Sequence, residues 1–541
     1  MSHHSFMKRL LLAILCSSLP LHAEEPAAQP KRPNIIVILA DDMGFSDIGC
    51  YGSEIPTPNL DALAKDGLRF TQFYNTGRCC PTRAALLTGL YSHQAGIGLM
   101  NEDEKAPGYR GFLTDNTCTI AEGLSKAGYF TAMSGKWHVG HDPDQRPNAR
   151  GFTRSLNLPA GGVYFPESPR CNLFLNGESI QPTDSRLPKN WYSSDLFADF
   201  GIRFIDEARQ EKKPFFLYLA YVAPHFPLQA EQADIDSFRG KYKEGWDSLS
   251  AKRLSRQRES GLIDSAWKPG PRPDNVAAWD SLDDAAKDRF DHLMATYAAV
   301  VTRLDRSIGT LVNALKERGE LDNTVILFMS DNGGNAESGP EGRSNGDPTK
   351  ASSEWFCGRS WAYLENTPFR MFKHFNHEGG IASPMIVHWP AGLKRPESGS
   401  RSAFIDTPAH VIDILPTCLD LGGATYPEAR NGRPVTPVEG KSLKPLLTAS
   451  GPLASRALFW EHEGNAAVRQ GDLKLVRHGM KGAWELYDLK TDRTEMNNLA
   501  STQADKAKEL QVMWRAWAKR ANVLPKPGAA KKAGGQGGEE E

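Results

Sequence analysis

The sequence predicts an α/β fold: a large mixed, mostly parallel sheet flanked by helices, followed by a small antiparallel sheet with one helix. Two observations indicate this. Between residues 33 and 450, short apolar runs rich in β-branched residues alternate with longer stretches of helical periodicity. From about Arg456 the pattern changes to closely spaced short strands and a last helix rich in lysine and tryptophan.

The first strand and helix set the pattern. The run RPNIIVILADD is apolar and β-branched until it meets two aspartates, which indicates a buried strand with a polar loop at its end. Thr57, Pro58 and Gly67 then mark a helix, with a threonine cap, a proline in the first turn and a glycine at the stop. A second helix is predicted in CCPTRAALLTG, because an early proline followed by an apolar run starts a helix well.

The later strands and helices continue the alternation. Further strands are predicted in YFTAMSGKW, PFFLYLAYVAPHFP, TVILFMSDNGG and ASPMIVHWPAGL, and helices in SSDLFADFGIRFIDEARQ and FDHLMATYAAVVTRLDRSIGTLVNALKERG. The charged segment from Gln229 to Leu282 predicts an irregular insertion near the rim of a pocket. On the same rim, Trp355, Trp361 and Tyr363 are expected to stack on an aromatic or sugar ring. The terminal strands are RALFWEHEG, AAVRQGDLKLVRHG and WELYDLKTD.

Bulk composition excludes some function classes. Of 541 residues, 40% are hydrophobic and 24% charged, which is enough apolar sequence for a sizeable core. The formal net charge of −1 gives no electrostatic footprint for nucleic acid or for an acidic membrane surface. We therefore expect no nucleic-acid partner and only local binding of any anion.

The N-terminus has the pattern of a secretory signal peptide. Lys8 and Arg9 precede an apolar run that begins at Leu10, and Ala23 supplies a small residue before polar sequence. The apolar run is too short for a stable anchor, so we expect export without a membrane anchor, to the periplasm or the medium. Loss of Cys16 with this segment leaves an odd number of the eight cysteines, none at zinc-knuckle spacing.

Polar residues gather where the predicted strands end and helices begin. Because ligands of such sheets bind at the carboxyl edge, we expect these residues to share one site. One set consists of oxygen ligands suited to calcium or magnesium: Asp41, Asp42, Asp331 and Asn332. The other set consists of donors suited to a tetrahedral oxyanion such as sulfate or phosphate: Arg83, Lys136, His138, His225 and Lys373. Each segment alone also suits an ordinary turn or loop, and their joint occurrence carries the inference.

At these residues the chain resembles the type I sulfatases, in particular the bacterial arylsulfatase-like branch. In that family Cys-x-Pro-Ser/Thr-Arg marks a cysteine that is oxidised to formylglycine, and CCPTR matches it with Cys79 first and Cys80 in the variable position. The segments ADDMG, GKWHVG, APHFP, SDNGG and TPFRMFKHFNHEGGI follow in the family's order. The resemblance extends from about Pro33 to Leu499.

The resemblance implies a fold of the alkaline phosphatase type, hydrolysis of a sulfate ester, and roles for both residue sets. Its metal ligands fall on Asp41, Asp42, Asp331, Asn332 and the modified Cys79, and its sulfate-binding and catalytic groups on Arg83, Lys136, His138, His225 and Lys373. The family favours calcium, whereas the ligand types alone also allow magnesium. Implied partners are a sulfated small molecule or glycan and a formylglycine-generating or sulfatase-maturing enzyme.

The implied organisation is a signal peptide over 1–23, a linker over 24–32, a catalytic domain over 33–450, a C-terminal subdomain over 451–525 and a disordered tail over 526–541. The implied mechanism uses hydrated formylglycine as the nucleophile, His225 and Lys373 at the leaving oxygen, and His138 as the base that restores the aldehyde. Oligomeric state cannot be read from the sequence.

Alternative functions remain open. A phosphatase or phosphonate monoester hydrolase of the same superfamily is the nearest, and a non-catalytic glycan-binding homologue is more remote. A thiol phosphatase is excluded, because the arginine it needs six residues after its cysteine is replaced by Ala85 or Leu86, and MSGKWH does not satisfy a P-loop. His374 and His377 also have a spacing that suits a two-histidine metal site on a helix.

Overall fold

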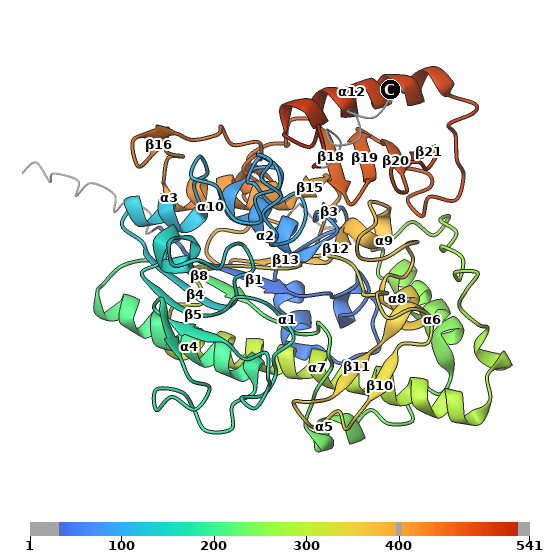
Figure 1. The fold of residues 1–541 in the computed structure, drawn as a ribbon, viewed down its shortest axis with the longest axis horizontal. Helices are drawn as coiled ribbons and strands as arrows, with labels where there is room; N and C mark the ends of the chain where they lie inside the picture. The colour runs from blue at the N-terminus through green and yellow to red at the C-terminus, as the bar shows by residue number, and fades with distance from the viewer. Residues whose placement is uncertain (1–31, 396–402, 528–541) are drawn as a thin grey trace, which may run out of the picture. The chain divides into compact units, whose positions relative to one another are not determined.

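The computed structural model describes residues 32–395 and 403–527, and its centre is a ten-stranded sheet (Figure 1). In sheet order the strands are β14 (Phe404–Ile405), β2 (Leu68–Phe70), β13 (Met385–His388), β9 (Thr324–Ser330), β1 (Asn34–Ala40), β8 (Phe215–Ala220), β4 (Phe130–Lys136), β5 (Arg154–Leu158), β6 (Leu173–Leu175) and β7 (Glu178–Ile180). From β9 to β5 all neighbours are parallel, whereas β13, β6 and β7 join antiparallel. The predicted mixed, mostly parallel sheet is confirmed.

Helices cover both faces of this sheet. Strand β1 is buried along its whole length, and its side chains alternate between two cores: Ile36 and Ile38 face one, and Ile35, Val37 and Leu39 the other. On the first face lie α4 (Ser193–Gln210) and α7 (Asp284–Glu317), and on the second α2 (Cys79–Thr88), α3 (Ile120–Lys126) and α10 (Ile414–Gly422) (Figure 1). Burial on both faces explains why the parallel strands are continuously apolar.

The C-terminal segment forms the predicted small antiparallel sheet with one helix. Its strands are β18 (Ala457–His462), β19 (Asn465–Gln470), β20 (Leu473–Arg477) and β21 (Trp484–Asp488), and α12 (Ala504–Arg520) packs on them. The indole of Trp514 in α12 donates a hydrogen bond to the carbonyl of Trp460 in β18, over 3.0 Å. The sheet packs on the main core through Tyr74 and Ile381. This part of the fold prediction is also confirmed.

The remaining elements are short or lie at the edges. They are α1 (Pro58–Asp66), α5 (Gln232–Asp236), α6 (Gly245–Glu259), α8 (Gly358–Glu365), α9 (Glu378–Ile381), α11 (Lys444–Leu447), strands β3 (Phe73–Tyr74), β10 (Arg343–Asn345), β11 (Glu354–Phe356), β12 (Ala382–Ser383), β15 (Ala409–His410), β16 (Ala429–Arg430) and β17 (Arg433–Pro434), and 3₁₀ helices η1 (Gly49–Tyr51), η2 (Pro143–Gln145), η3 (Pro147–Arg150), η4 (Trp279–Ser281) and η5 (Val411–Asp413). Helix α1 begins after Thr57 as expected, but the Thr57 hydroxyl accepts a hydrogen bond from the Gly49 amide (2.8 Å) and does not cap the helix.

Two expectations about the pocket rim are wrong. The segment from Gln229 to Leu282 is not irregular, because it contains α5, α6 and η4, and the guanidinium of Arg253 in α6 is buried between Asp47 and Glu54. Trp355 and Trp361 are 5% and 0% exposed, so they belong to the core and cannot stack on a substrate. Large aromatic side chains gain more from burial than from a place on a rim.

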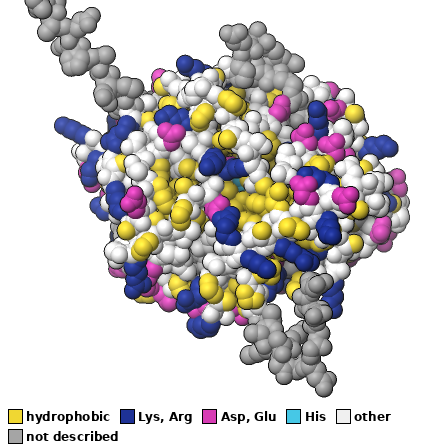
Figure 2. All heavy atoms as spheres, turned by 90° about the horizontal axis from the view of Figure 1, so that it is seen from above, with side chains coloured by type: hydrophobic (Ala, Val, Ile, Leu, Met, Phe, Trp, Pro, Cys, Tyr) yellow, Lys and Arg dark blue, Asp and Glu magenta, His cyan; other side chains and the backbone are white. Residues whose placement is uncertain are grey.

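The surface agrees with the near-neutral charge of the chain. On the face shown in Figure 2, Lys and Arg side chains are interspersed with Asp and Glu side chains. Within the described ranges, no helix is long and apolar enough to cross a membrane. The predicted signal peptide, and the tail beyond residue 527, lie outside the described residues, whereas Lys526 pairs with the buried Glu461.

Candidate active site

The carboxyl edge of β1 and β9 brings the predicted oxygen ligands together. The two strands are parallel with Ala40 opposite Ser330, so the residues that follow each strand face one another. The Asn332 amide donates to Asp42 Oδ1 over 2.8 Å, and the Asp42 backbone amide donates to Asp331 Oδ1 over 3.2 Å. All four predicted ligands, Asp41, Asp42, Asp331 and Asn332, are at most 2% exposed.

Two glycines hold these ends in place. A Cβ on Gly333 would lie 1.9 Å from the Gly379 carbonyl oxygen, so the glycines of SDNGG let the loop approach a second chain segment. Gly135, before Lys136 in β4, has φ +118°, and a Cβ there would lie 1.8 Å from the Ala220 carbonyl oxygen of β8. SDNGG is therefore more than a turn sequence, because close backbone packing requires the glycine at position 333.

The oxygen ligands fit a hard divalent cation. Asp41 Oδ1 and Asn332 Oδ1 are buried, and neither has a hydrogen-bond partner among the described residues. A buried polar oxygen without a partner is costly, and two that meet at one sheet edge are the expected signature of ligands that share a cation. Oxygen donors alone favour calcium or magnesium over zinc.

Helix α2 supplies a thiol and an arginine to the same edge. Its first residue is Cys79, 1% exposed, and the Thr82 hydroxyl joins the helix to β9 by donating to the Asp331 carbonyl over 2.6 Å. Arg83 is fully buried. Its Nη2 lies 2.8 Å from Asp331 Oδ2 and 3.5 Å from Asp41 Oδ2, and its Nη1 donates to the Lys136 carbonyl over 2.9 Å. The helix thus directs its amino end and a cation at the site.

The pKa values of the two adjacent thiols are shifted in opposite directions. Contact with the Cys80 thiol, together with the charge of Lys136, holds the pKa of Cys79 well below its ordinary value despite burial. Burial, and the neighbouring Cys79, raise the pKa of Cys80 well above it. The Cys80 thiol donates to Asn101 Oδ1 over 3.2 Å. Cys79 is therefore the more acidic of the two thiols in this environment.

Strand β4 ends in a lysine and a histidine that face the carboxylates. Lys136 Nζ lies 2.7 Å from Asp41 Oδ2, and both side chains are almost fully buried. Burial opposes ionisation of Asp41, but Lys136, His225 and Arg83 keep its pKa below the ordinary value. His138, which adopts φ +59°, is buried near Cys79, and burial with Lys136 lowers its pKa to about 4. His138 is thus a neutral imidazole able to accept a proton.

His225 and Lys373 both contact Asp42. His225 Nδ1 lies 2.6 Å from the Phe226 carbonyl oxygen, and its Nε2 lies 3.5 Å from Asp42 Oδ2. The imidazole stacks on Phe226, with ring centroids 4.2 Å apart. Lys373 Nζ lies 2.8 Å from Asp42 Oδ1 and 3.2 Å from Glu337 Oε2. Every residue of the two predicted sets, oxygen ligands and oxyanion donors, therefore lies at this one edge of the sheet.

The structure adds residues that the sequence analysis missed. Asn335 donates a hydrogen bond to Asp42 Oδ2 over 2.7 Å. The Glu337 carboxylate pairs with Lys373, Arg78 and His374. Both lie within SDNGGNAESG, directly after the predicted ligands, so the motif extends further than was recognised. Arg78 precedes Cys79, and only the fold shows that it joins Glu337.

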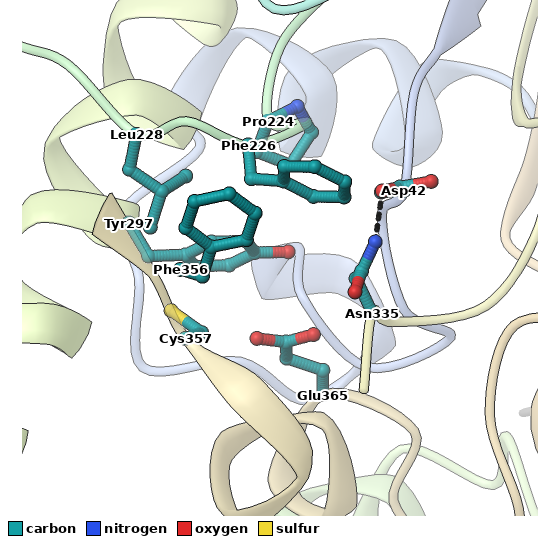
Figure 3. Close-up of a pocket in the computed structure, with 9 residues that line it drawn as sticks. All are labelled: Asp42, Pro224, Phe226, Leu228, Tyr297, Asn335, Phe356, Cys357 and Glu365. Atoms are coloured by element: carbon teal, nitrogen blue, oxygen red, sulfur yellow. Dashed lines mark hydrogen bonds between the residues drawn. The ribbon is translucent and has the colours of Figure 1, made fainter. Parts of the chain in front are cut away.

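A small pocket of about 20 Å³ lies beside Asp42 (Figure 3). The rings of Phe226 and Phe356 stack with centroids 4.3 Å apart on one side, and the Glu365 carboxyl group points into the pocket from the other (Figure 3). Burial, and nearby Asp47, raise the pKa of Glu365 well above its ordinary value, which favours the neutral form of this carboxyl group.

The predicted metal site formed by His374 and His377 on one helix is wrong. His377 Nε2 lies 3.3 Å from Glu485 Oε2 in β21, whereas His374 points to Glu337 and Glu463. The two residues are not on one helix, because α9 begins only at Glu378. Every cysteine in the described ranges is a free thiol.

Comparisons with known families and proteins agree with this geometry. A family model described as Sulfatase matches residues 33–424, and one described as N-sulphoglucosamine sulphohydrolase, C-terminal, matches residues 369–520. The chain is 38% identical to an uncharacterized sulfatase of Schizosaccharomyces pombe, over 92% of this chain and 96% of the relative. It is 34% identical to an arylsulfatase of Klebsiella aerogenes, over 78% of this chain and 94% of the relative.

Solved structures show the same architecture. Ps i-CgsB in complex with k-i-k-neocarrahexaose has a TM-score of 0.67 and 26% identity, over 92% of this chain and 98% of that one. The phosphonate monoester hydrolase of Agrobacterium radiobacter has a TM-score of 0.56 and 20% identity, over 91% and 96%, which shows a shared fold alone. The alkaline-phosphatase-like fold predicted from the sequence is confirmed.

Proposed function

This chain belongs to the sulfatase family and is a sulfuric ester hydrolase, and from that premise we propose that its nucleophile is formylglycine made from Cys79. One observation carries the proposal: the Cys79 thiol begins helix α2, is nearly buried, and has its pKa lowered beside Lys136 and His138. A thiol bonded to sulfate has no easy route of release. The hydrate of formylglycine supplies one hydroxyl to attack the ester sulfur and a second whose deprotonation expels sulfate.

The proposed cofactor is one divalent cation, calcium in preference to magnesium. Asp41, Asp42, Asp331 and Asn332, with modified Cys79, would hold it, as the two unpartnered buried oxygens support. A cation bound there supplies electrostatic polarisation of the sulfate oxygens.

The proposed roles of the other residues follow from their positions. Arg83 and Lys136 stabilise the charge of the sulfuryl group in the transition state, where one preorganised donor contributes about 3 kcal/mol. His225 and Lys373, which both contact Asp42, protonate and stabilise the leaving oxygen. His138, a neutral imidazole close to Cys79, takes the proton when the aldehyde is restored.

The proposed substrate is an aryl sulfate or a sulfated carbohydrate. Both kinds of relative support it: an arylsulfatase of Klebsiella aerogenes, and a 28% identical N-acetylglucosamine-6-O-sulfatase of Bacteroides thetaiotaomicron. We further propose that a formylglycine-generating or sulfatase-maturing enzyme modifies Cys79, and that the segment over 1–23 exports the protein to the periplasm or the medium.

The test is the mass of the chymotryptic peptide that follows Tyr74, from protein produced with and without a maturing enzyme. We expect a change from thiol to aldehyde at Cys79, with sulfatase activity only in the changed sample. Active protein with an unmodified Cys79 would contradict the proposal. Rates on matched aryl sulfate and aryl phosphate separate it from a phosphatase or phosphonate monoester hydrolase, because those enzymes would prefer the phosphate.

A further inference from the structure

A second cluster of metal-ligating side chains lies outside the carboxylate edge. It joins His374, in the loop before α9, to His462 and Glu463, at the tip of the β18–β19 hairpin. One ligand atom of each residue lies within 4.8 Å of the others. The two segments are about 90 residues apart in the sequence, so the packing of the small sheet on the main domain creates the cluster.

The two ring nitrogens of His462 are buried and make no hydrogen bond with any described residue. The side chain as a whole is 0% exposed. A fully buried imidazole normally pairs at least one of its nitrogens, so two unpaired ones call for a ligand that the protein atoms do not supply. Glu463 Oε1 lies 3.6 Å from His462 Nε2.

The other two ligands converge on the same space. His374 Nδ1 lies 2.8 Å from Glu463 Oε2, and the rings of His374 and His462 have centroids 5.8 Å apart at 37°. Ligand atoms around tetrahedral zinc lie roughly 3.3 Å from one another, so small side-chain rotations would complete the shell. His374 and Glu463 adopt φ +81° and +51°, a region uncommon for residues other than glycine, which indicates that the fold holds both in place.

The surrounding charges permit a cation. Arg78 contacts His374 Nε2, and its charge is paired with Glu337 at 2.5 Å. Lys373 also pairs with Glu337 and with Asp42. Arg78 Nη1 also lies 3.5 Å from His374 Nδ1, the nitrogen next to Glu463, so a bound metal would take Nδ1 while the guanidinium keeps its contacts with Nε2 and Glu337.

We propose that His374, His462 and Glu463 form a second metal site, which takes a zinc-class transition metal and joins the β18–β19 hairpin to the loop that carries Lys373. Two imidazoles and one carboxylate suit zinc and exclude calcium as the preferred ion, because calcium needs six or more oxygen ligands. A water molecule would complete a tetrahedral shell. The site is separate from the oxygen site at Asp41 and Asn332 in both donor type and position.

The test measures zinc binding to the untagged mature protein with calcium at saturation, so that the oxygen site is filled. Isothermal titration and metal analysis after gel filtration should give one zinc per chain. His462→Ala and the milder Glu463→Gln should each weaken zinc affinity more than ~10-fold. Loss of a residue that only supports a ligand can weaken metal affinity ~10-fold, so loss of a ligand should exceed that value. His478→Ala, which removes an exposed histidine of the same sheet, should bind zinc as the native chain does.

Three results would overturn the proposal: no zinc on the native chain, native affinity in Glu463→Gln, or an X-ray absorption spectrum without two imidazoles. The Glu463 variant keeps the test decisive if His462→Ala does not fold. None of these measurements depends on sulfatase activity, so they do not stand or fall with the roles proposed for Cys79.

Discussion

Substitution of Glu378 by glutamine should destabilise the fold by about 3 kcal/mol, because it removes the carboxylate that pairs with two buried cations, of which only Lys474 keeps a second carboxylate partner, Glu495 at 2.9 Å. Glu378 Oε1 lies 2.8 Å from Lys474 Nζ in β20, and its Oε2 lies 2.8 Å from Arg493 Nε. All three side chains are at most 1% exposed. The carboxylate therefore joins the loop that carries Lys373 to the C-terminal sheet.

The lowered pKa of Glu378 gives a similar value for the stability that its carboxylate contributes. Lys474 and Arg493 outweigh burial and lower the pKa of Glu378 from 4.5 to about 2. At about 1.4 kcal/mol for each tenfold change in ionisation, that difference corresponds to roughly 3 kcal/mol. Because the pKa is lower in the folded state, this stability is complete above pH 4.5 and is lost as the pH falls toward 2.

Equilibrium unfolding in urea, followed by tryptophan fluorescence, measures the effect. The difference in free energy of unfolding between the native protein and Glu378→Gln should be largest at pH 7. It should decrease between pH 4.5 and the lowest pH at which the native chain is folded. The matched control is Glu354→Gln, whose partner Arg343 is 3.2 Å away and 48% exposed, and it should cost at most about 1 kcal/mol. A Glu378→Gln protein within about 1 kcal/mol of native at pH 7 would refute the reasoning.

Other predictions concern the active site. Arg83→Ala should lower kcat on an aryl sulfate about 10²–10³-fold; a native kcat in folded protein would contradict its role. Cys79→Ala should abolish turnover while Cys80→Ser retains it after maturation, and equal losses in the two variants would argue against Cys79 as the modified residue. Asn335→Ala removes the 2.7 Å hydrogen bond to Asp42 and should weaken calcium binding about 10–100-fold by isothermal titration, whereas unchanged affinity would exclude that support.

Much of the fold was predictable because its signals are local. The apolar run of β1 is long, β-branched and buried on both faces, so it reads as a parallel strand without knowledge of its neighbours. The insertion from Gln229 to Leu282 was misread because α6 owes its stability to a long-range contact. Its Arg253 is buried against Asp47 and Glu54, about 200 residues away, and no local pattern announces that pairing.

The same distinction applies to the site. Asp41, Cys79, Lys136 and Asp331 each end a strand or begin a helix, and parallel topology alone requires such positions to meet at one edge. Asn335 lies in a recognised motif, but its importance depends on a loop path that the motif does not specify. Trp361 shows the reverse error. Its polar neighbours in the sequence suggested a place on the pocket rim, but its side chain is fully buried in the structure.

The sequence by itself determined the fold class, the order of strands and helices, and the residues that gather at the carboxyl edge, because strand ends and helix starts are encoded within a few residues. Only the tertiary structure decided which thiol of the Cys79–Cys80 pair is the more acidic, which carboxylates pair with Arg83 and Lys136, and that His374 lies beside His462 and not His377. Acidity and ligand grouping depend on burial and on distances between charges, and those distances exist only once segments remote in sequence have packed together.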